Sequence, residues 1–167
     1  MSTSPNPEQQ IRAEILDTGD ERILSAQIEI DAPASVIFDI IVQPHRHPEI
    51  DGSGSVRGVI TGPERLSLGD KFRMQMRIGV SYRVTSTVVE FDPDRRIAWC
   101  HMLGNRWSYE LTPISESKTL VRETNDIRAA GWRASLSPAA RKLDAGARSI
   151  AKSLVRLKQL AESEAAS

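Results

Sequence analysis

Three side chains able to exchange protons lie on extended segments in the second half of the chain. His101 and Glu123 occupy positions predicted to share one sheet face, and Tyr109 lies on the segment between them. A buried carboxylate is costly without a partner, and histidine with carboxylate is a common proton-transfer pair. His101, Glu123 and Tyr109 are therefore the candidate catalytic residues, with His101 as the expected partner of Glu123.

Two other interpretations of Glu123 stay open at this point. Successive strand side chains alternate between faces, so a slip of one residue would expose Glu123 and bury Leu120 instead. The second interpretation is that Glu123 and His101 point inward but only hold a ligand hydroxyl or carbonyl, because acid–base catalysis also requires reach to a substrate atom.

Histidine and carboxylate recur at every second position in a short polar stretch, at His45, His47, Glu49 and Asp51. These residue types are familiar zinc or iron ligands, but the spacing fits no established motif, and four convergent ligands would need an irregular loop. Cys100 has no assignable base beside it and is a poor nucleophile candidate. We therefore predict no metal site and no cofactor.

The composition is that of one globular domain. The chain has 167 residues, of which 40% are hydrophobic and 26% charged. Its 22 basic and 22 acidic side chains cancel, so a nucleic-acid partner is not expected. No apolar run approaches the ~18 residues of a membrane span, so stable membrane insertion is not expected either. The first residues lack a secretory pattern and the single cysteine cannot form an internal disulfide, which predicts a cytoplasmic location.

Alternation of apolar and polar residues, separated by glycine, proline and asparagine turns, predicts seven antiparallel strands. The strands are expected at residues 23–30, 55–60, 70–78, 80–91, 96–103, 106–113 and 119–128. The segment 80–91 changes parity between Val84 and Val89, which indicates a β-bulge.

Helical periodicity appears twice. A helix of about ten residues is expected through Val42, followed by a loop or single turn, and a long final helix from residue 137 to about 164. Gly146 in that helix indicates either close approach of a ligand or the sheet, or tolerance on an exposed face. Residues 1–20 are expected to form a flexible tail with a short helical turn near Ile15, and 21–164 a single domain.

The predicted strand parities gather an apolar and aromatic set on one face, with a few polar groups, as ligand pockets are usually lined. Ordinary core packing is the alternative explanation for such residues. The candidate ligand-binding residues are Phe72, Met74, Met76, Trp99, His101, Trp107, Tyr109, Glu123, Asn125, and Ala147 and Ile150 of the final helix.

The element order and four segments resemble the START-like or helix-grip superfamily (SRPBCC), which includes polyketide cyclase/dehydrase and lipid-transport domains. The segments are EIDAPASVIFDIIVQPHRHPEI, RIAWCHML, RWSYELTP and KTLVRET, and the match runs from about Glu21 to Leu160. The resemblance implies an α+β fold: a curved seven-stranded antiparallel sheet around a long C-terminal helix, with short helices after strand one. It also implies a cavity between sheet and helix, with His45 and His47 at its rim.

The resemblance does not select one activity, because fold alone leaves function open. The leading hypothesis is a protein that binds a hydrophobic small molecule, such as a lipid, polyketide or aromatic metabolite. A polyketide aromatase/cyclase using His101, Tyr109 or Glu123 is the first alternative, and an interaction module with a vestigial cavity is the second. Whether the chain forms a homodimer is left open.

Overall fold

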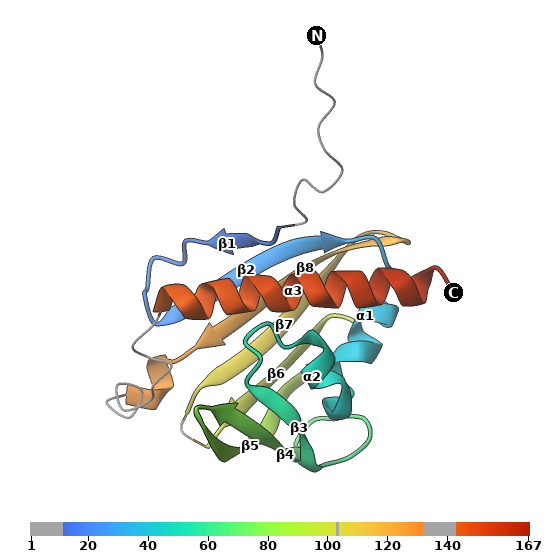
Figure 1. Cartoon of the computed structure of the whole chain (residues 1–167). Coiled ribbons are helices and arrows are strands. Elements are labelled where there is room, and N and C mark those ends of the chain that lie inside the picture. Colours follow the sequence, from blue (N-terminus) through green and yellow to red (C-terminus); the bar gives the residue numbers. More distant parts are fainter. Residues whose placement is uncertain (1–11, 103, 132–142) are drawn as a thin grey trace.

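The structure, a computed structural model, describes residues 12–102, 104–131 and 143–167. One antiparallel sheet of eight strands, in the order β1-β2-β8-β7-β6-β5-β4-β3, curves around a long helix (Figure 1). The strands are β1 (Glu14–Leu16), β2 (Ile23–Ile30), β3 (Val56–Thr61), β4 (Lys71–Ile78), β5 (Val80–Asp92), β6 (Arg96–His101), β7 (Arg106–Ser115) and β8 (Lys118–Asp126). The helices are α1 (Ala34–Ile41), the 3-10 helix η1 (Pro44–Arg46), α2 (His47–Ile50) and α3 (Leu143–Ala165).

The α+β helix-grip architecture is as predicted, but the sheet has eight strands rather than seven. The additional strand, β1, pairs antiparallel with β2, placing Ile15 opposite Ala26. The prediction of a helical turn near Ile15 is wrong, because hydrogen bonding to the edge of β2 holds this segment extended. β1 falls within the span 1–20 assigned to a tail, and residues 1–11 of that span lie outside the described residues.

The predicted bulge in β5 is confirmed. The pairing of β5 with β6 shifts register between Val88 and Glu90. Val88 is buried before the shift, and Phe91, three residues later, packs against the same core, so the bulge changes which positions of the strand face inward.

The two faces of the sheet differ in polarity. In β4, Phe72 and Met74 are buried against the interior, whereas Lys71 and Arg73, which alternate with them, are exposed. This alternation follows from the two-residue period of a strand. The apolar concave face is the one that α3 covers.

Helix α3 packs one apolar stripe onto the concave face. Ile150, Leu154, Leu157 and Ala161 are almost completely buried, at helical spacing, while Lys152 is exposed. The helix runs across β2 and β8 in Figure 1. Its predicted beginning, residues 137–142, lies outside the described residues.

Gly146 marks a close approach between α3 and β2. A β-carbon at this position would lie 2.7 Å from Cδ1 of Leu24. Of the explanations left open by the sequence, close approach of the sheet fits this contact.

The segment predicted as a loop after α1 is partly helical. Pro44 begins η1, as its fixed φ angle favours, and α2 follows directly. His47 and Ile50, three residues apart in α2, are both buried. This turn of helix brings one side of the segment into the interior.

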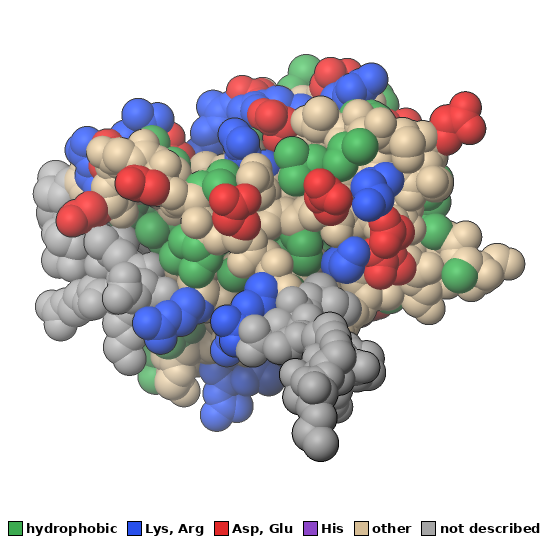
Figure 2. Space-filling view, turned by 90° about the horizontal axis from the view of Figure 1, so that it is seen from above, with side chains coloured by type: hydrophobic (Ala, Val, Ile, Leu, Met, Phe, Trp, Pro, Cys, Tyr) green, Lys and Arg blue, Asp and Glu red, His purple; other side chains and the backbone are tan. Residues whose placement is uncertain are grey.

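The surface carries charges of both signs. On the face shown in Figure 2, acidic and basic side chains are interspersed rather than gathered by sign. Within the described ranges, no helix combines the length and apolar character needed to cross a membrane.

Candidate ligand pocket

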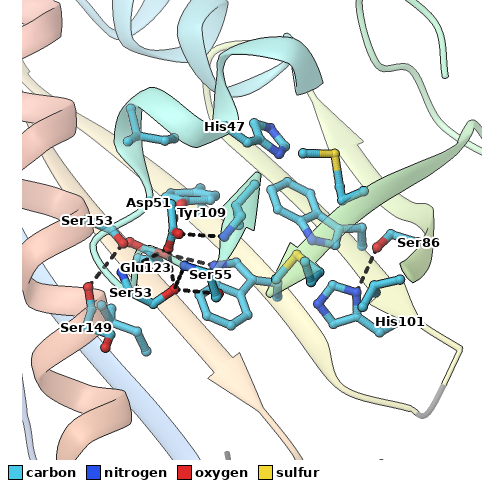
Figure 3. Close-up of a pocket in the computed structure, with 18 of the residues that line it drawn as sticks. His47, Asp51, Ser53, Ser55, Ser86, His101, Tyr109, Glu123, Ser149 and Ser153 are labelled. Carbon is cyan, nitrogen blue, oxygen red and sulfur yellow. Dashed lines mark hydrogen bonds between the residues drawn. The ribbon is translucent and has the colours of Figure 1, made fainter. Parts of the chain in front are cut away.

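A cavity of about 150 Å³ lies between the concave face of the sheet, α2 and α3 (Figure 3). Most predicted pocket residues line it: Phe72, Met74, Met76, Trp99, His101, Trp107, Tyr109, Glu123 and Ile150. His47, predicted at the rim, also lines the cavity. The remaining lining residues were not predicted from the sequence: Ile50, Asp51, Ser53, Ser55, Val56, Val84, Ser86, Ser149 and Ser153. The cavity therefore has an apolar and aromatic side on the sheet and a more polar side on the 51–55 loop and α3.

Two candidate ligand-binding residues do not line this cavity. Asn125 shares the inward face of β8 with Glu123 but pairs with Leu24, near the end of the sheet where α3 approaches closely at Gly146. Ala147 is half-buried on α3, and the cavity begins about one turn further along, at Ser149 and Ile150. Both predictions are corrected, because parity specifies the face of a strand but not how far along it the cavity extends.

Glu123 is the most deeply buried ionisable group of the site, with 1% of its surface exposed. The register slip considered for β8 is thereby excluded. Its Oε1 accepts hydrogen bonds from Tyr109 Oη and from Trp107 Nε1, each at 2.8 Å. Desolvation raises the pKa of Glu123 to about 8, although these two donors act in the opposite direction. The side chain is therefore mostly a neutral carboxylic acid at pH 7.

His101 lies in the same cavity but does not pair with Glu123. Its Nδ1 shares a hydrogen bond of 2.7 Å with Oγ of Ser86. Burial lowers the pKa of His101 to about 4, so the imidazole is neutral at pH 7. The predicted His101–Glu123 pair is wrong, because the register across β7 and β8 gives the carboxyl a tyrosine and a tryptophan as neighbours instead.

His47 is inside the molecule, not at the rim. It is 8% exposed, its Nε2 donates a hydrogen bond of 2.9 Å to the Ile41 carbonyl, and its ring stacks on Trp99 at 5.3 Å. Burial lowers the pKa of His47 to about 4. The rim prediction is corrected for His47, because the helical turn of α2 directs its ring inward. His45 is exposed, as a rim position requires, but it does not line the cavity.

The loop between α2 and β3 forms the polar wall and is held by its own hydrogen bonds. Asp51 Oδ1 accepts from the main-chain N–H and the hydroxyl of Ser53, at 2.9 and 2.7 Å, and Oδ2 accepts from the N–H of Val56 at 2.8 Å. The Gly52 N–H donates to Oγ of Ser153 on α3 at 2.8 Å. The Asp51 carboxylate is therefore engaged in shaping the loop.

This loop touches α3 so closely that only glycine fits at position 52. A β-carbon there would lie 2.4 Å from the Ser149 carbonyl oxygen and 2.5 Å from the Ser153 nitrogen, both main-chain atoms. Arg156 of α3 also donates a hydrogen bond of 2.5 Å to the Asp51 carbonyl. The loop and the helix thus form one continuous wall of the pocket.

No lysine or arginine of residues 12–102, 104–131 and 143–167 lines the pocket. Within the described ranges, no three His, Cys, Asp or Glu side chains are placed to hold a metal ion, and His45, His47, Glu49 and Asp51 do not converge. The described lining thus offers hydrogen-bonding groups and the neutral side chains of Glu123, His47 and His101 in a largely apolar enclosure.

A curved antiparallel sheet closed by a C-terminal helix over an internal cavity defines the START-like, helix-grip class of proteins. The family model described as "polyketide cyclase / dehydrase and lipid transport" matches residues 22–162. The chain belongs to this family.

Two curated mycobacterial proteins are similar to part of this chain. The uncharacterized protein Rv0088 of Mycobacterium tuberculosis is 43% identical over 118 residues, which are 70% of this chain and 52% of Rv0088. This chain thus spans about half the length of the curated relatives it matches.

Solved structures share the fold at low sequence identity. Protein Ms6760 from Mycobacterium smegmatis has a TM-score of 0.67 and 17% identity over 92% of this chain and 99% of its own. The Zhui aromatase/cyclase from Streptomyces sp. R1128 has a TM-score of 0.64 and 18% identity over 84% of this chain and 93% of its own. At these identities the likeness concerns the fold alone.

Proposed function

We propose that this chain binds a hydrophobic small molecule in the cavity between the sheet and α3. The observation that carries the proposal is the lining itself: aromatic, methionine and aliphatic side chains with a few polar groups, which is how small-molecule sites are usually built. Met74 and Met76 suit an adaptable wall, because methionine is unbranched and polarizable. The family, which includes lipid-transport proteins by its description, supports the same proposal.

The size of the cavity favours a compact ligand. Its volume of about 150 Å³ resembles that of engineered apolar cavities that take up benzene, and is below the ~300–1,000 Å³ of drug-sized sites. Among the ligand classes considered, an aromatic metabolite of one or two rings fits best. A long lipid or a multi-ring polyketide would require the walls to move apart.

Native mass spectrometry of the purified protein tests this proposal. We expect an apolar adduct that is released on denaturation. Val84→Phe, which fills the cavity from β5, should abolish the adduct, whereas Val89→Phe on the exposed face of the same strand should retain it. If Val84→Phe retained the adduct at full occupancy, the ligand would have to lie elsewhere. If the protein carried no adduct and also failed to bind small aromatic probes, the proposal would be rejected.

An aromatase/cyclase-type enzyme is the second candidate. It is favoured by the presence of Glu123, Tyr109 and His101 in one enclosure, and by the similarity of the fold to the Zhui aromatase/cyclase. A confined cavity can hold a chain in a reactive conformation while such groups move protons. Dehydration of a short linear poly-β-ketone surrogate, followed by mass spectrometry and abolished in Glu123→Gln, would favour catalysis over binding alone.

The vestigial-cavity alternative predicted a collapsed interior. The cavity between α2, α3 and the sheet argues against it. We therefore do not propose that the chain is an interaction module.

A further inference from the structure

One oxygen of the buried carboxyl in the pocket has no protein partner. Glu123 Oε1 accepts two hydrogen bonds, from Trp107 and Tyr109, while Oε2 is buried and no donor or acceptor of the described residues reaches it. Buried polar atoms are rarely left unpaired, because each costs the free energy of its lost hydration. Glu123 lines the cavity, so a ligand is well placed to supply the missing partner.

The hydrogen-bond pattern indicates which oxygen carries the proton. Both contacts at Oε1 come from donors, an indole N–H and a phenol O–H, so Oε1 acts as the acceptor. In the neutral acid the proton therefore resides on Oε2, which makes Oε2 a buried donor with no partner among the described residues. The raised pKa of Glu123 is consistent with this protonation state.

The remaining charges around the cavity disfavour an anionic ligand. Among the residues that the structure describes, no lysine or arginine lines the cavity, and both histidines, His47 and His101, are neutral at pH 7 because burial lowers their pKa values to about 4. Asp51 is engaged by the N–H groups of its own loop. A ligand carboxylate or phosphate would thus be desolvated without a counter-ion, which is strongly unfavourable.

We infer that the pocket selects a compact, neutral ligand that carries a carbonyl oxygen, and that Glu123 donates a hydrogen bond from Oε2 to that oxygen. This inference rests on the proposed binding function and specifies its ligand class. Glu123 is then the residue that distinguishes a ketone, aldehyde or ester from a hydrocarbon of the same shape.

Four probes of nearly equal shape test the inference by NMR titration at pH 7. They are acetophenone, its hydrocarbon isostere α-methylstyrene, the anion benzoate and the cation 1-phenylethylamine. The quantity of interest is the ratio of the α-methylstyrene Kd to the acetophenone Kd, compared between variants so that differences in hydrophobicity cancel. We expect benzoate and 1-phenylethylamine to bind at least about tenfold more weakly than acetophenone.

Substitutions at position 123 distinguish the effect of the hydrogen-bond donor from the effect of pocket shape. Glu123→Leu removes the donor, and the ratio should fall about tenfold, the change that ~1.4 kcal/mol of lost hydrogen bonding produces. Glu123→Gln keeps an acceptor for Trp107 and Tyr109 and a donor for the ligand, so it should rescue most of the preference. Glu29→Leu, on the exposed side of β2, is the matched control and should leave the ratio unchanged.

A measurement on the wild-type protein tests the same hydrogen bond even if the Glu123→Leu variant does not fold. The infrared carbonyl stretch of ¹³C-labelled acetophenone should shift to lower frequency on binding, relative to its value in an alkane solvent. An unshifted stretch, a ratio that Glu123→Leu leaves unchanged, or preferred binding of the cation or the anion would each overturn the inference while leaving the binding function intact. Failure of both neutral probes to bind would instead count against the proposed function.

Discussion

Tyr109 and Glu123 lie directly opposite each other on β7 and β8, and the tyrosine hydroxyl donates a hydrogen bond of 2.8 Å to the buried carboxyl. The cross-strand pairing therefore places an acid and a phenol in contact within the interior. Burial, and after it the neighbouring carboxyl, raises the pKa of Tyr109 well above its ordinary value.

Removal of the Tyr109 hydroxyl should weaken the fold modestly. Tyr109→Phe deletes one hydrogen bond while Trp107 still donates to Glu123, so we expect a loss of about 0.5–1.5 kcal/mol in the free energy of unfolding. It should also raise the pKa of Glu123 further, because one stabilising donor of the carboxylate is gone. Urea denaturation measures the first effect, with Tyr82→Phe as a control on a partly exposed tyrosine. Equal losses in the two variants would contradict the assigned role.

Stability should pass through a maximum near pH 6.5. The folded pKa values of His47 and His101 are lowered from 6.5 to about 4, so unfolding takes up protons between these values and stability rises with pH there. The folded pKa of Glu123 is raised from 4.5 to about 8, so its contribution is present below pH 4.5 and is lost as pH rises toward 8. Below pH 6.5 the two histidines take up more protons on unfolding than the one carboxyl releases, so stability rises with pH. Above pH 6.5 proton release by the carboxyl dominates, so stability falls.

Denaturation series from pH 4 to 8 check this profile. Above pH 6.5 the slope should be negative, up to about 1.4 kcal/mol per pH unit, since one proton is released on unfolding. Glu123→Gln should lack this decline, because the amide does not titrate. A wild-type profile that is flat or rising between pH 6.5 and 8 would show that Glu123 is ionised in the folded protein.

Truncation of Leu154 should be costly. This residue is completely buried on the stripe of α3 that covers the sheet, and Leu154→Ala should reduce the free energy of unfolding by roughly 2–5 kcal/mol through lost burial and a residual cavity. Lys152→Ala, two residues away and exposed, should change it by less than about 0.5 kcal/mol. Chemical denaturation of both variants provides the comparison, and similar losses would mean that the buried face of α3 is wrongly assigned.

Gly52→Ala should disrupt the wall between the loop and α3. The added methyl group would meet main-chain atoms of Ser149 and Ser153 at about 2.4–2.5 Å, and main-chain atoms cannot rotate away. Gly54→Ala is the control: its φ of 69° costs roughly 1–2 kcal/mol, but no atom of the described residues lies within 4 Å of the new methyl group. We expect Gly52→Ala to lose more thermal stability than Gly54→Ala. Only Gly52→Ala should also weaken probe binding. Comparable melting temperatures would refute a tight loop–helix contact.

Strand periodicity predicted much of this architecture because it depends only on neighbouring residues. The faces of β4, β6, β7 and β8 follow from alternation, which placed Glu123 and His101 inward. The pairing partner of Glu123 depends on the β7–β8 turn, where a register shift between Pro113 and Ser115 makes counting back from the turn ambiguous. Strand parity alone therefore led to His101, rather than Tyr109, as the predicted partner of Glu123.

The missed features depend on contacts between distant parts of the chain. β1 has three residues, too few to show alternation, and is fixed by pairing with β2. The polar wall around Ser53 and Ser55 is shaped locally by Asp51, but it is held against the pocket by Ser153 of α3, 101 residues beyond Gly52. Its local sequence therefore resembles an ordinary loop. His47 did carry a local signal: Ile50 lies three residues later, at the spacing that places two side chains on one face of a helix.

The order of the elements along the chain has a consequence for synthesis on the ribosome. All eight strands precede α3, so the concave face, including Met74 and Trp99, emerges before the helix that covers it. At typical elongation rates of about 5–20 residues per second, the stretch from Asp126 to Ala161 takes roughly 2–7 s to appear. During that interval the nascent sheet presents an uncovered apolar surface, which is the kind of surface that chaperones bind.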